Sequence, residues 1–335
     1  DVDLNFGPFC AGAARTGQQL VRDVFNHYGF DYYHPESKAA QSYRLKTWLK
    51  AHPGLAGAET ENVLLRQYVN SMKKMISQTP RKTSVSSKVT ASSVPNSNKL
   101  AATAIQRKLE QGADVNPYLS KGLFVAYEED QLLYSWRIYH FHLNDDQTKH
   151  SFFKDRSDWL LMALVEYEAA YLLDIREHVE KDEEGANNVW SRQELISILT
   201  GEFSDVAKKY RLNGLLPPES QLSDSEVRKM RKAGVNVIPS SGEDMLALGA
   251  GIATDDSSME ATMHTDQMMQ MIYSWEKYLN EKIEDINADF EKQGLKTTKM
   301  QFKLGLDEDG FFVYEASTNA RLRGLCQKQY FNPTN

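Results

Sequence analysis

The chain has 335 residues, of which 41% are hydrophobic and 25% are charged. This balance is typical of a globular protein and excludes a disordered or fibrous one, and the length predicts two or three lobes. The formal net charge of -7 excludes the strongly basic composition of a general nucleic-acid-binding protein, so any nucleic-acid site has to be a local basic patch.

The cysteines and the apolar runs indicate where the protein acts. Cys10 and Cys326 lie near opposite ends of the chain without a CxxC partner, so neither a zinc ribbon nor a disulfide framework is indicated. No apolar run approaches the roughly 20 residues needed to cross a bilayer, and no basic-then-apolar N-terminal signal is visible. We therefore expect a cytoplasmic protein with no membrane partner. A leader removed before Asp1 stays an open alternative.

Residues 1–79 are expected to form a helical N-terminal lobe. Thr16 is a suitable N-cap for a first helix, and a second helix is predicted over residues 37–51. In residues 58–78 apolar side chains recur at three- and four-residue spacing, which predicts an amphipathic helix. These apolar residues are Leu65, Val69, Met72 and Ile76.

Residues 80–98 are rich in serine, threonine and proline and contain no aromatic residue. Because such a segment can bury little apolar surface, we expect a flexible linker. Its basic residues Arg81, Lys82 and Lys88 fit a solvated tether better than a phosphate contact.

Residues 99–200 are expected to hold a central antiparallel sheet with flanking helices. A helix is predicted from about Leu100 to Gln111, with Gly112 ending it. The alternation over residues 136–143 predicts a strand. Residues 160–178 alternate in the same way and have a short break near their centre, which predicts a β-hairpin.

Three of the eight histidines lie on predicted strand positions, namely His140, His142 and His178. One face of the first strand carries Trp136, Ile138, His140 and His142, and the other carries Arg137, Tyr139, Phe141 and Leu143. Each face therefore mixes apolar and polar groups. In a strand with only a structural role, apolar and polar side chains more often lie on opposite faces. We therefore take this sheet as the candidate functional region.

Residues 201–335 are expected to form a mixed C-terminal lobe with a long helix and a β-hairpin. Before it, Ser191 and Glu194 have the spacing of a helix capping box, and Ser223 and Glu226 repeat that spacing. The glycine-containing residues 246–254 match no phosphate-binding motif and predict a close-packed strand or turn.

The end of this lobe is predicted from its apolar pattern. A helical stripe predicts a long core helix and consists of Met268, Ile272, Trp275, Leu279, Ile286 and Phe290. Residues 299–317 form two alternating segments around Asp309-Gly310, which predicts the hairpin.

His140 and His142 have the spacing of two metal ligands on one strand face, with Asp145 and His150 close in sequence. A catalytic zinc site needs three protein ligands, and no complete motif such as HExxH is present. The sequence therefore predicts no cofactor and no metal. A metal-dependent hydrolase that uses the histidine pair stays an alternative.

The other chemistry that these residue types suit is metal-free cleavage of RNA. In this reaction an imidazole assists the 2'-hydroxyl and cations stabilise the charge that develops on the phosphorus. The candidate catalytic residues are His140, His142, Arg156, Arg176 and His178. The candidate substrate-binding residues beside them are Arg137, Tyr139 and Lys154. The purely structural alternative is that these charged residues protect an edge strand of the sheet from pairing with another chain.

A second group of candidate substrate-binding residues lies on the predicted helix that begins after Ser223. These cations are Arg228, Lys229, Arg231 and Lys232. Together they can form a phosphate-facing surface, although a solvated helix face is the simpler explanation.

Residues 136–178, with the segments WRIYHFHL and DRSDWLLMALVEYEAAYLLDIREH, resemble the strand and hairpin core of RelE/ParE-type bacterial toxins. In that superfamily a compact antiparallel sheet carries basic and aromatic residues, and several members cleave messenger RNA without a metal. The resemblance implies that Arg156, Arg176 and His178 occupy strand-end positions of the kind that such toxins use.

The sequence as a whole predicts an α+β protein with a helical N-terminal lobe, a central antiparallel sheet and a mixed C-terminal lobe. We expect an intracellular ribonuclease-like effector of the toxin or phage-defence type, with RNA and a protein partner or antitoxin as candidate partners. The competing class is a non-enzymatic interaction protein or regulatory subunit of a bacterial or phage complex. The sequence predicts no oligomeric state.

Overall fold

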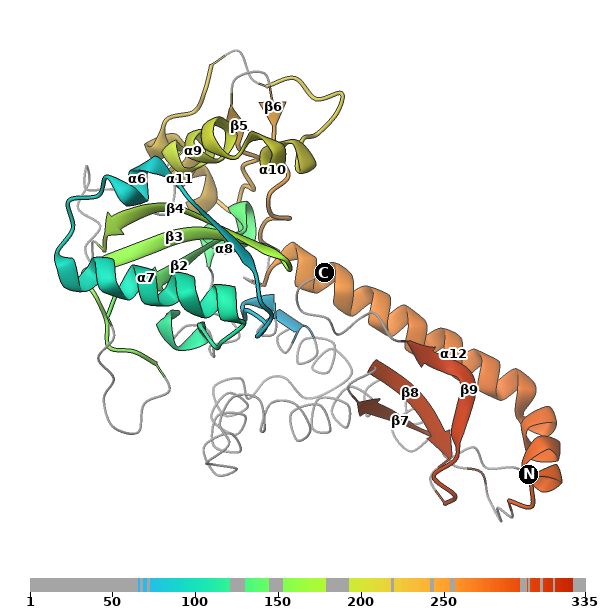
Figure 1. Cartoon of the computed structure of the whole chain (residues 1–335). Coiled ribbons are helices and arrows are strands. Elements are labelled where there is room, and N and C mark those ends of the chain that lie inside the picture. Colours follow the sequence, from blue (N-terminus) through green and yellow to red (C-terminus); the bar gives the residue numbers. More distant parts are fainter. Residues whose placement is uncertain are drawn as a thin grey trace, which may run out of the picture. The chain divides into compact units, whose positions relative to one another are not determined.

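The structure is a computed structural model that describes most of the chain from residue 73 onward. The described residues are 66, 69–70, 73–120, 130–144, 153–178, 193–217, 220–241, 244–253, 257–295, 300, 302–307, 310–315 and 317–327. They form the helices and strands of an α+β protein (Figure 1). The N-terminal helices expected within residues 1–79 lie almost entirely outside this set. Within it, no helix is long and apolar enough to cross a membrane.

The chain divides into two compact units. One consists of Asn70–Thr262 with Pro333–Asn335, and the other of Met263–Asn332 with Asp1–Val69. This division differs from the expected lobes, because residues 201–262 belong with the central sheet.

A four-stranded sheet in the order β1-β4-β3-β2 is the centre of the first unit. Strands β2 (Ile138–His142), β3 (Trp159–Val165) and β4 (Ala169–Glu177) form an antiparallel meander, so the predicted hairpin is confirmed. Strand β1 (Lys82–Val85) pairs with β4 in parallel. The expectation of a purely antiparallel sheet is therefore wrong for this fourth strand.

Helix α8 (Gln131–Trp136) precedes β2 and takes the first residues of the strand that the sequence predicts. Asp130 caps the helix by accepting a hydrogen bond from the Leu133 amide at 2.9 Å. Trp136 is fully buried, and Arg137 ends the helix in the left-handed conformation with φ 56°. The strand therefore begins two residues later than predicted, because an alternating pattern alone does not mark this change of backbone direction.

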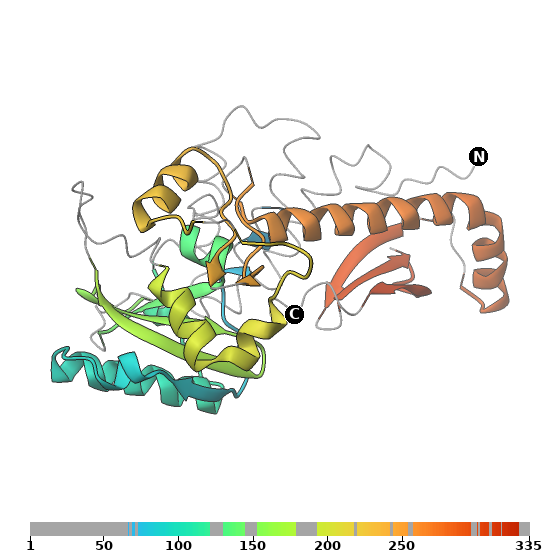
Figure 2. The same cartoon turned by 90° about the horizontal axis from the view of Figure 1, so that it is seen from above.

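The two faces of the sheet are covered by different helices. Helix α7 (Asn96–Gln111) lies on one face, while α9 (Glu194–Glu202), α10 (Ser204–Lys209) and α11 (Asp224–Lys232) lie on the other (Figures 1 and 2). On the second face, sheet and helix residues form one continuous apolar cluster. Its buried members are Leu132, Trp136, Ile138, Leu160, Met162, Leu164, Leu173, Leu195, Ile196, Ile198, Leu199, Val206, Ala207, Val227, Leu246 and Leu248. This shared core joins residues 204–248 to the sheet.

Two glycines of this unit lie where another part of the chain comes too close for a Cβ atom. Gly112 ends α7 with φ 70°, as predicted, and a Cβ there would meet the ring of Pro80. A Cβ at Gly249 would collide with the Tyr134 carbonyl oxygen, so the stretch predicted to be close-packed is confirmed. Short strands β5 (Ser240–Ser241) and β6 (Asp244–Met245) precede it.

Helix starts in this unit agree only partly with the predicted capping boxes. At α11 the box is present, since the Ser223 amide donates to Glu226 Oε2 at 2.7 Å and the Glu226 amide donates to Ser223 Oγ at 3.3 Å. At α9 the N-cap is Gln193, which makes no side-chain cap, and Ser191 lies outside the described residues. The short 3-10 helix η2 (Asn116–Tyr118) follows α7.

The segment expected to be a flexible linker is built into the sheet, so that expectation is wrong. It forms β1, helix α6 (Ser87–Thr90) and the start of α7. The buried Arg81 side chain donates to the carbonyl oxygens of Glu166 at 2.8 Å and Thr79 at 2.7 Å. Glu202 of α9 accepts hydrogen bonds from the Ser87 amide and hydroxyl. Hydrogen bonds to β4 and α9 thus order a segment that has few apolar side chains.

Limited trypsin digestion of the native chain is expected to spare the bonds after Arg81, Lys82 and Lys88. The reason is that a protease needs an extended, locally unfolded segment, whereas Lys82 lies in β1 and Lys88 in α6. Arg81 directly precedes β1 and its side chain is bound by backbone carbonyl oxygens. Mass spectrometry of the first fragments checks this, with digestion in urea as the control. First cuts at these three bonds would contradict the ordered strand.

The second unit contains most of α12 (Met259–Lys292) and a three-stranded antiparallel sheet. Its strands are β7 (Phe302–Asp307), β8 (Gly310–Glu315) and β9 (Arg321–Gln327). They lie alongside the C-terminal part of α12 in both views (Figures 1 and 2). The predicted helix and hairpin are confirmed, whereas β9 was not predicted.

The apolar stripe of α12 is core, as the sequence predicts. Met268, Trp275, Leu279 and Phe290 are buried. The Ile272 side chain lies outside what the structure describes, and Ile286 is half-buried.

Candidate functional site

Polar groups gather at one end of the sheet face that α9 covers. Cross-strand pairing aligns His140 of β2 with Met162 of β3 and Asp174 of β4, so all three lie on this face. The register shift after Met162 places Leu173 and Asp174 opposite one position of β3, as in a β-bulge. Leu173 enters the apolar cluster. The bulge therefore lets β4 contribute both a core side chain and a carboxylate to the same face.

Three imidazoles, His140, His142 and His178, form what we call the histidine cluster. The ring centroids of His140 and His142 are 6.3 Å apart, and those of His142 and His178 are 5.6 Å apart. His178 follows the last residue of β4, and its amide donates to the Asp158 carbonyl. The sequence predicted these three residues as a group, and the structure brings them together.

Exposure differs within the histidine cluster. His140 and His142 are 9% and 5% exposed, whereas His178 at the strand end is half-buried. A substrate group therefore reaches His178 more easily than the other two imidazoles.

The surroundings of His142 hold it in its neutral form. Burial, together with the nearby His140 and His178, lowers the pKa of His142 from 6.5 to about 4. The Ser157 amide donates to His142 Nδ1 at 3.4 Å, so in the neutral ring the proton lies on Nε2. Nε2 then acts as a donor on the side of the ring away from Ser157.

His140 is tied to the start of α8. Its Nδ1 lies 3.7 Å from Asp130 Oδ2, and the other carboxylate oxygen of Asp130 caps that helix. Sequence reasoning missed Asp130, although an aspartate directly before an apolar helical run is a recognisable N-cap signal. The His140 ring therefore lies beside the carboxylate that caps α8.

Two predicted cations near the cluster have different surroundings. Arg156 is exposed and directly precedes Ser157, whose amide donates to His142, so its backbone lies beside the cluster. Its charge is a minor cause of the lowered pKa of His142. Lys154 instead places its ammonium 5.6 Å from the centre of the Tyr118 ring.

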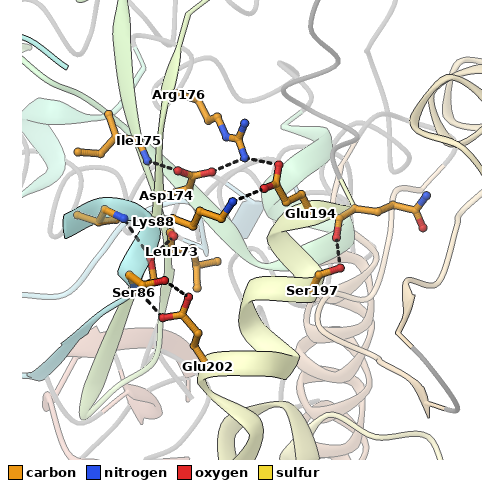
Figure 3. Close-up of polar contacts among 12 residues, drawn as sticks. Ser86, Lys88, Leu173, Asp174, Ile175, Arg176, Glu194, Ser197 and Glu202 are labelled. Carbon is orange, nitrogen blue, oxygen red and sulfur yellow. Dashed lines mark hydrogen bonds and ion pairs between the residues drawn. The ribbon is translucent and has the colours of Figure 1, made fainter. Parts of the chain in front are cut away.

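Arg176 is bound by two carboxylates (Figure 3). It forms ion pairs with Asp174 and, at 2.6 Å, with Glu194 at the start of α9, and Lys88 of α6 reaches Glu194 at 2.9 Å. Burial raises the pKa of Asp174, and the hydrogen bonds from Lys88 and Arg176 lower the pKa of Glu194. Arg176 therefore joins β4 to α9, and Glu194 serves this network in place of the predicted capping box.

The α11 cations do not form one surface. Arg231 is 5% exposed, and its guanidinium lies 4.4 Å from the centre of the Trp136 ring, a cation–π contact within the core. Lys229 and Lys232 are exposed, while Arg228 is half-buried. The expected four-cation phosphate surface is therefore wrong for Arg231.

Arg137 and Tyr139 lie toward the other end of β2. Tyr139 is buried, its hydroxyl donates to the Lys73 carbonyl at 3.4 Å, and burial raises its pKa. Both residues line a pocket that is separate from the histidine cluster.

The metal alternative depends on a third ligand near His140 and His142. Among the residues that the structure describes, no group of three or more histidine, cysteine, aspartate or glutamate side chains is arranged to hold a metal ion. Asp145 and His150 lie outside those residues.

No family model, curated protein or solved structure matches this chain. The resemblance of residues 136–178 to RelE/ParE-type toxins stays a prediction from the sequence. Function has to be inferred from the chemistry of the site.

Proposed function

We propose that this protein is a ribonuclease-like effector that cleaves RNA by metal-free acid–base chemistry at the histidine cluster. The observation that carries the proposal is the convergence of three imidazoles at one end of a rigid sheet face, with the exposed Arg156 close by. Acid–base groups and a cation in one place are what cleavage by a 2'-hydroxyl needs. The proposal agrees with what the resemblance to bacterial toxins implies.

The roles follow from exposure and protonation. His178 is the accessible imidazole, so we assign it the proton transfer to or from the reacting oxygen. In the reaction the 2'-oxygen loses its proton and bonds to phosphorus, and the 5'-oxygen leaves with a proton. We assign Arg156 the stabilisation of the extra negative charge on the phosphoryl oxygens. The products are a 2',3'-cyclic phosphate and a 5'-hydroxyl.

The remaining predicted catalytic residues act as positioning residues in this proposal. His142, with its proton on Nε2, packs against His178 at 5.6 Å between ring centroids and limits the orientations of that ring. Arg176 joins β4 to α9 through Glu194, and His140 lies beside the Asp130 carboxylate that caps α8. A sheet site supported in this way keeps its geometry without substrate. A protein partner, such as an antitoxin, would regulate the activity in the cytoplasm by covering the site.

The purified chain is expected to cleave single-stranded RNA, or messenger RNA on ribosomes, in the presence of EDTA. The proposal requires fragments that end in 2',3'-cyclic phosphate, detected by mass spectrometry, and requires DNA of the same sequence to stay intact. Absence of cleavage on both RNA substrates would favour the interaction-protein class. Cleavage that appears only when a transition metal is added would favour a metal-dependent hydrolase that uses His140 and His142.

A further inference from the structure

Arg137 has a backbone conformation that arginine disfavours. Among the described non-glycine residues, only Arg137 and Asn319 have positive φ, 56° and 55°. Asparagine tolerates the left-handed region because its short side chain bonds locally, whereas a long side chain gains nothing there. Unfavourable backbone geometry of this kind is concentrated at ligand-binding positions.

The Arg137 side chain lines a pocket in the first unit. The other lining residues are Lys73, Met75, Ile76, Arg81, Leu133, Tyr134, Tyr139, Val165, Glu166, Gly249, Ser258 and Glu260. Within the described part of the chain, the half-buried Arg137 guanidinium makes no hydrogen bond or ion pair. A guanidinium with five donors is normally satisfied when it is partly buried.

The carboxylates of the pocket already have cationic or hydroxyl partners. Glu166 accepts hydrogen bonds from Lys209 at 3.0 Å and from the Tyr210 hydroxyl at 2.8 Å. Glu260 pairs with Lys73 at 3.0 Å. Because both carboxylates are neutralised in this way, the Arg137 charge gives the pocket a positive surplus.

The size of the pocket restricts the ligand. Its volume is about 40 Å³, and a water molecule needs at least about 10–15 Å³ on the same measure. The space therefore holds about three waters, which fits the oxygens of one small anion and not a nucleobase.

We propose that this pocket binds a phosphate-sized oxyanion through the guanidinium fork of Arg137. The planar fork matches two oxygens of a tetrahedral anion, and partial burial strengthens such charge-assisted bonds. Arg137 lies three positions before His140 and five before His142, or about 10 Å and about 16 Å at the usual rise of a strand. The site is therefore distinct from the histidine cluster and does not depend on the proposed ribonuclease activity. Free phosphate and a terminal phosphate monoester share this chemistry.

Inorganic phosphate titrated into the full chain, followed by isothermal calorimetry, tests the site. The wild-type chain is expected to bind one phosphate saturably, in a background of chloride at constant ionic strength. Arg137→Asn is expected to weaken binding at least tenfold. Asparagine tolerates the positive φ of this position, but it does not carry the positive charge of the guanidinium. Arg107→Gln removes an exposed guanidinium on α7 and is expected to bind as the wild type does.

Two further measurements complete the test. Arg137→Lys keeps the charge but not the fork, so its affinity is expected between those of Arg137→Asn and the wild type. A short 5'-phosphorylated oligonucleotide, compared with its 5'-hydroxyl form, distinguishes a terminal phosphate from free phosphate as the ligand. Urea unfolding of Arg137→Asn without phosphate is expected to show a midpoint equal to or above that of the wild type. No saturable binding by the wild type, or equal binding by a folded Arg137→Asn, would overturn the proposal.

Discussion

His178→Ala is expected to lower the rate of RNA cleavage by roughly two to four orders of magnitude, the usual contribution of a general acid or base. The side chain is half-buried at the end of β4 and is the most accessible imidazole of the histidine cluster. Its removal leaves the apolar cluster of the sheet intact, so the melting temperature is expected to change little. Initial cleavage rates in EDTA and a thermal melt of the same sample measure the two effects.

His140→Ala is the matched control, because it removes an imidazole from the same cluster at a buried position. His140 is 9% exposed and lies 3.7 Å from Asp130, so its loss is expected to cost about 1–3 kcal/mol of folding stability. The ratio of activity loss to stability loss should thus be much larger for His178→Ala. If both variants melt earlier and neither changes cleavage, the histidine cluster is structural and the assignment has to be abandoned.

Acidification from pH 7.5 to pH 4 is expected to remove about 2–3 kcal/mol of folding stability through His142 alone. The folded-state pKa of about 4 lies below the ordinary value of 6.5, so the unfolded chain binds the proton more tightly. The stabilisation is complete above about pH 6.5 and is lost progressively as the pH falls toward 4, at about 1.4 kcal/mol for each unit of pKa difference. Urea unfolding at several pH values measures it.

His142→Gln isolates this contribution, because glutamine does not titrate and retains hydrogen-bonding groups. Between pH 6.5 and 4 the wild type is expected to lose more stability than the variant, and the two curves should run parallel above pH 7. Glu194, whose pKa is lowered, loses its stabilising charge in both proteins at acid pH and cancels in the difference. Parallel curves over the whole range would mean that His142 is not held in its neutral form.

The elements that were predicted correctly have local signals. The β3–β4 hairpin, α7 with Gly112, and the capping box of α11 each depend on residues a few positions apart. The same holds for the histidine cluster in part, because alternation along β2 places His140 and His142 on one face.

The missed features have partners distant in sequence. Strand β1 has no apolar pattern of its own and is ordered by pairing with β4, 87 residues later. From the sequence alone, Arg176 was predicted to be a catalytic cation. In the fold its guanidinium forms ion pairs with Asp174 and Glu194. Arg231 belongs to a basic run, yet it packs on Trp136. In each case the partner decides the role of the charge.

The sequence by itself determined the α+β class, the hairpin and the residue types that gather at the end of the central sheet. Those features depend on hydrophobic periodicity and turn chemistry, which are local. Only the tertiary structure decided that β1 joins the sheet in parallel, that His178 is more exposed than His140 and His142, and that Arg137 faces a pocket. Burial and electrostatic pairing arise from residues far apart in the chain, and they set which imidazole is neutral and which cation is still available to bind an anion.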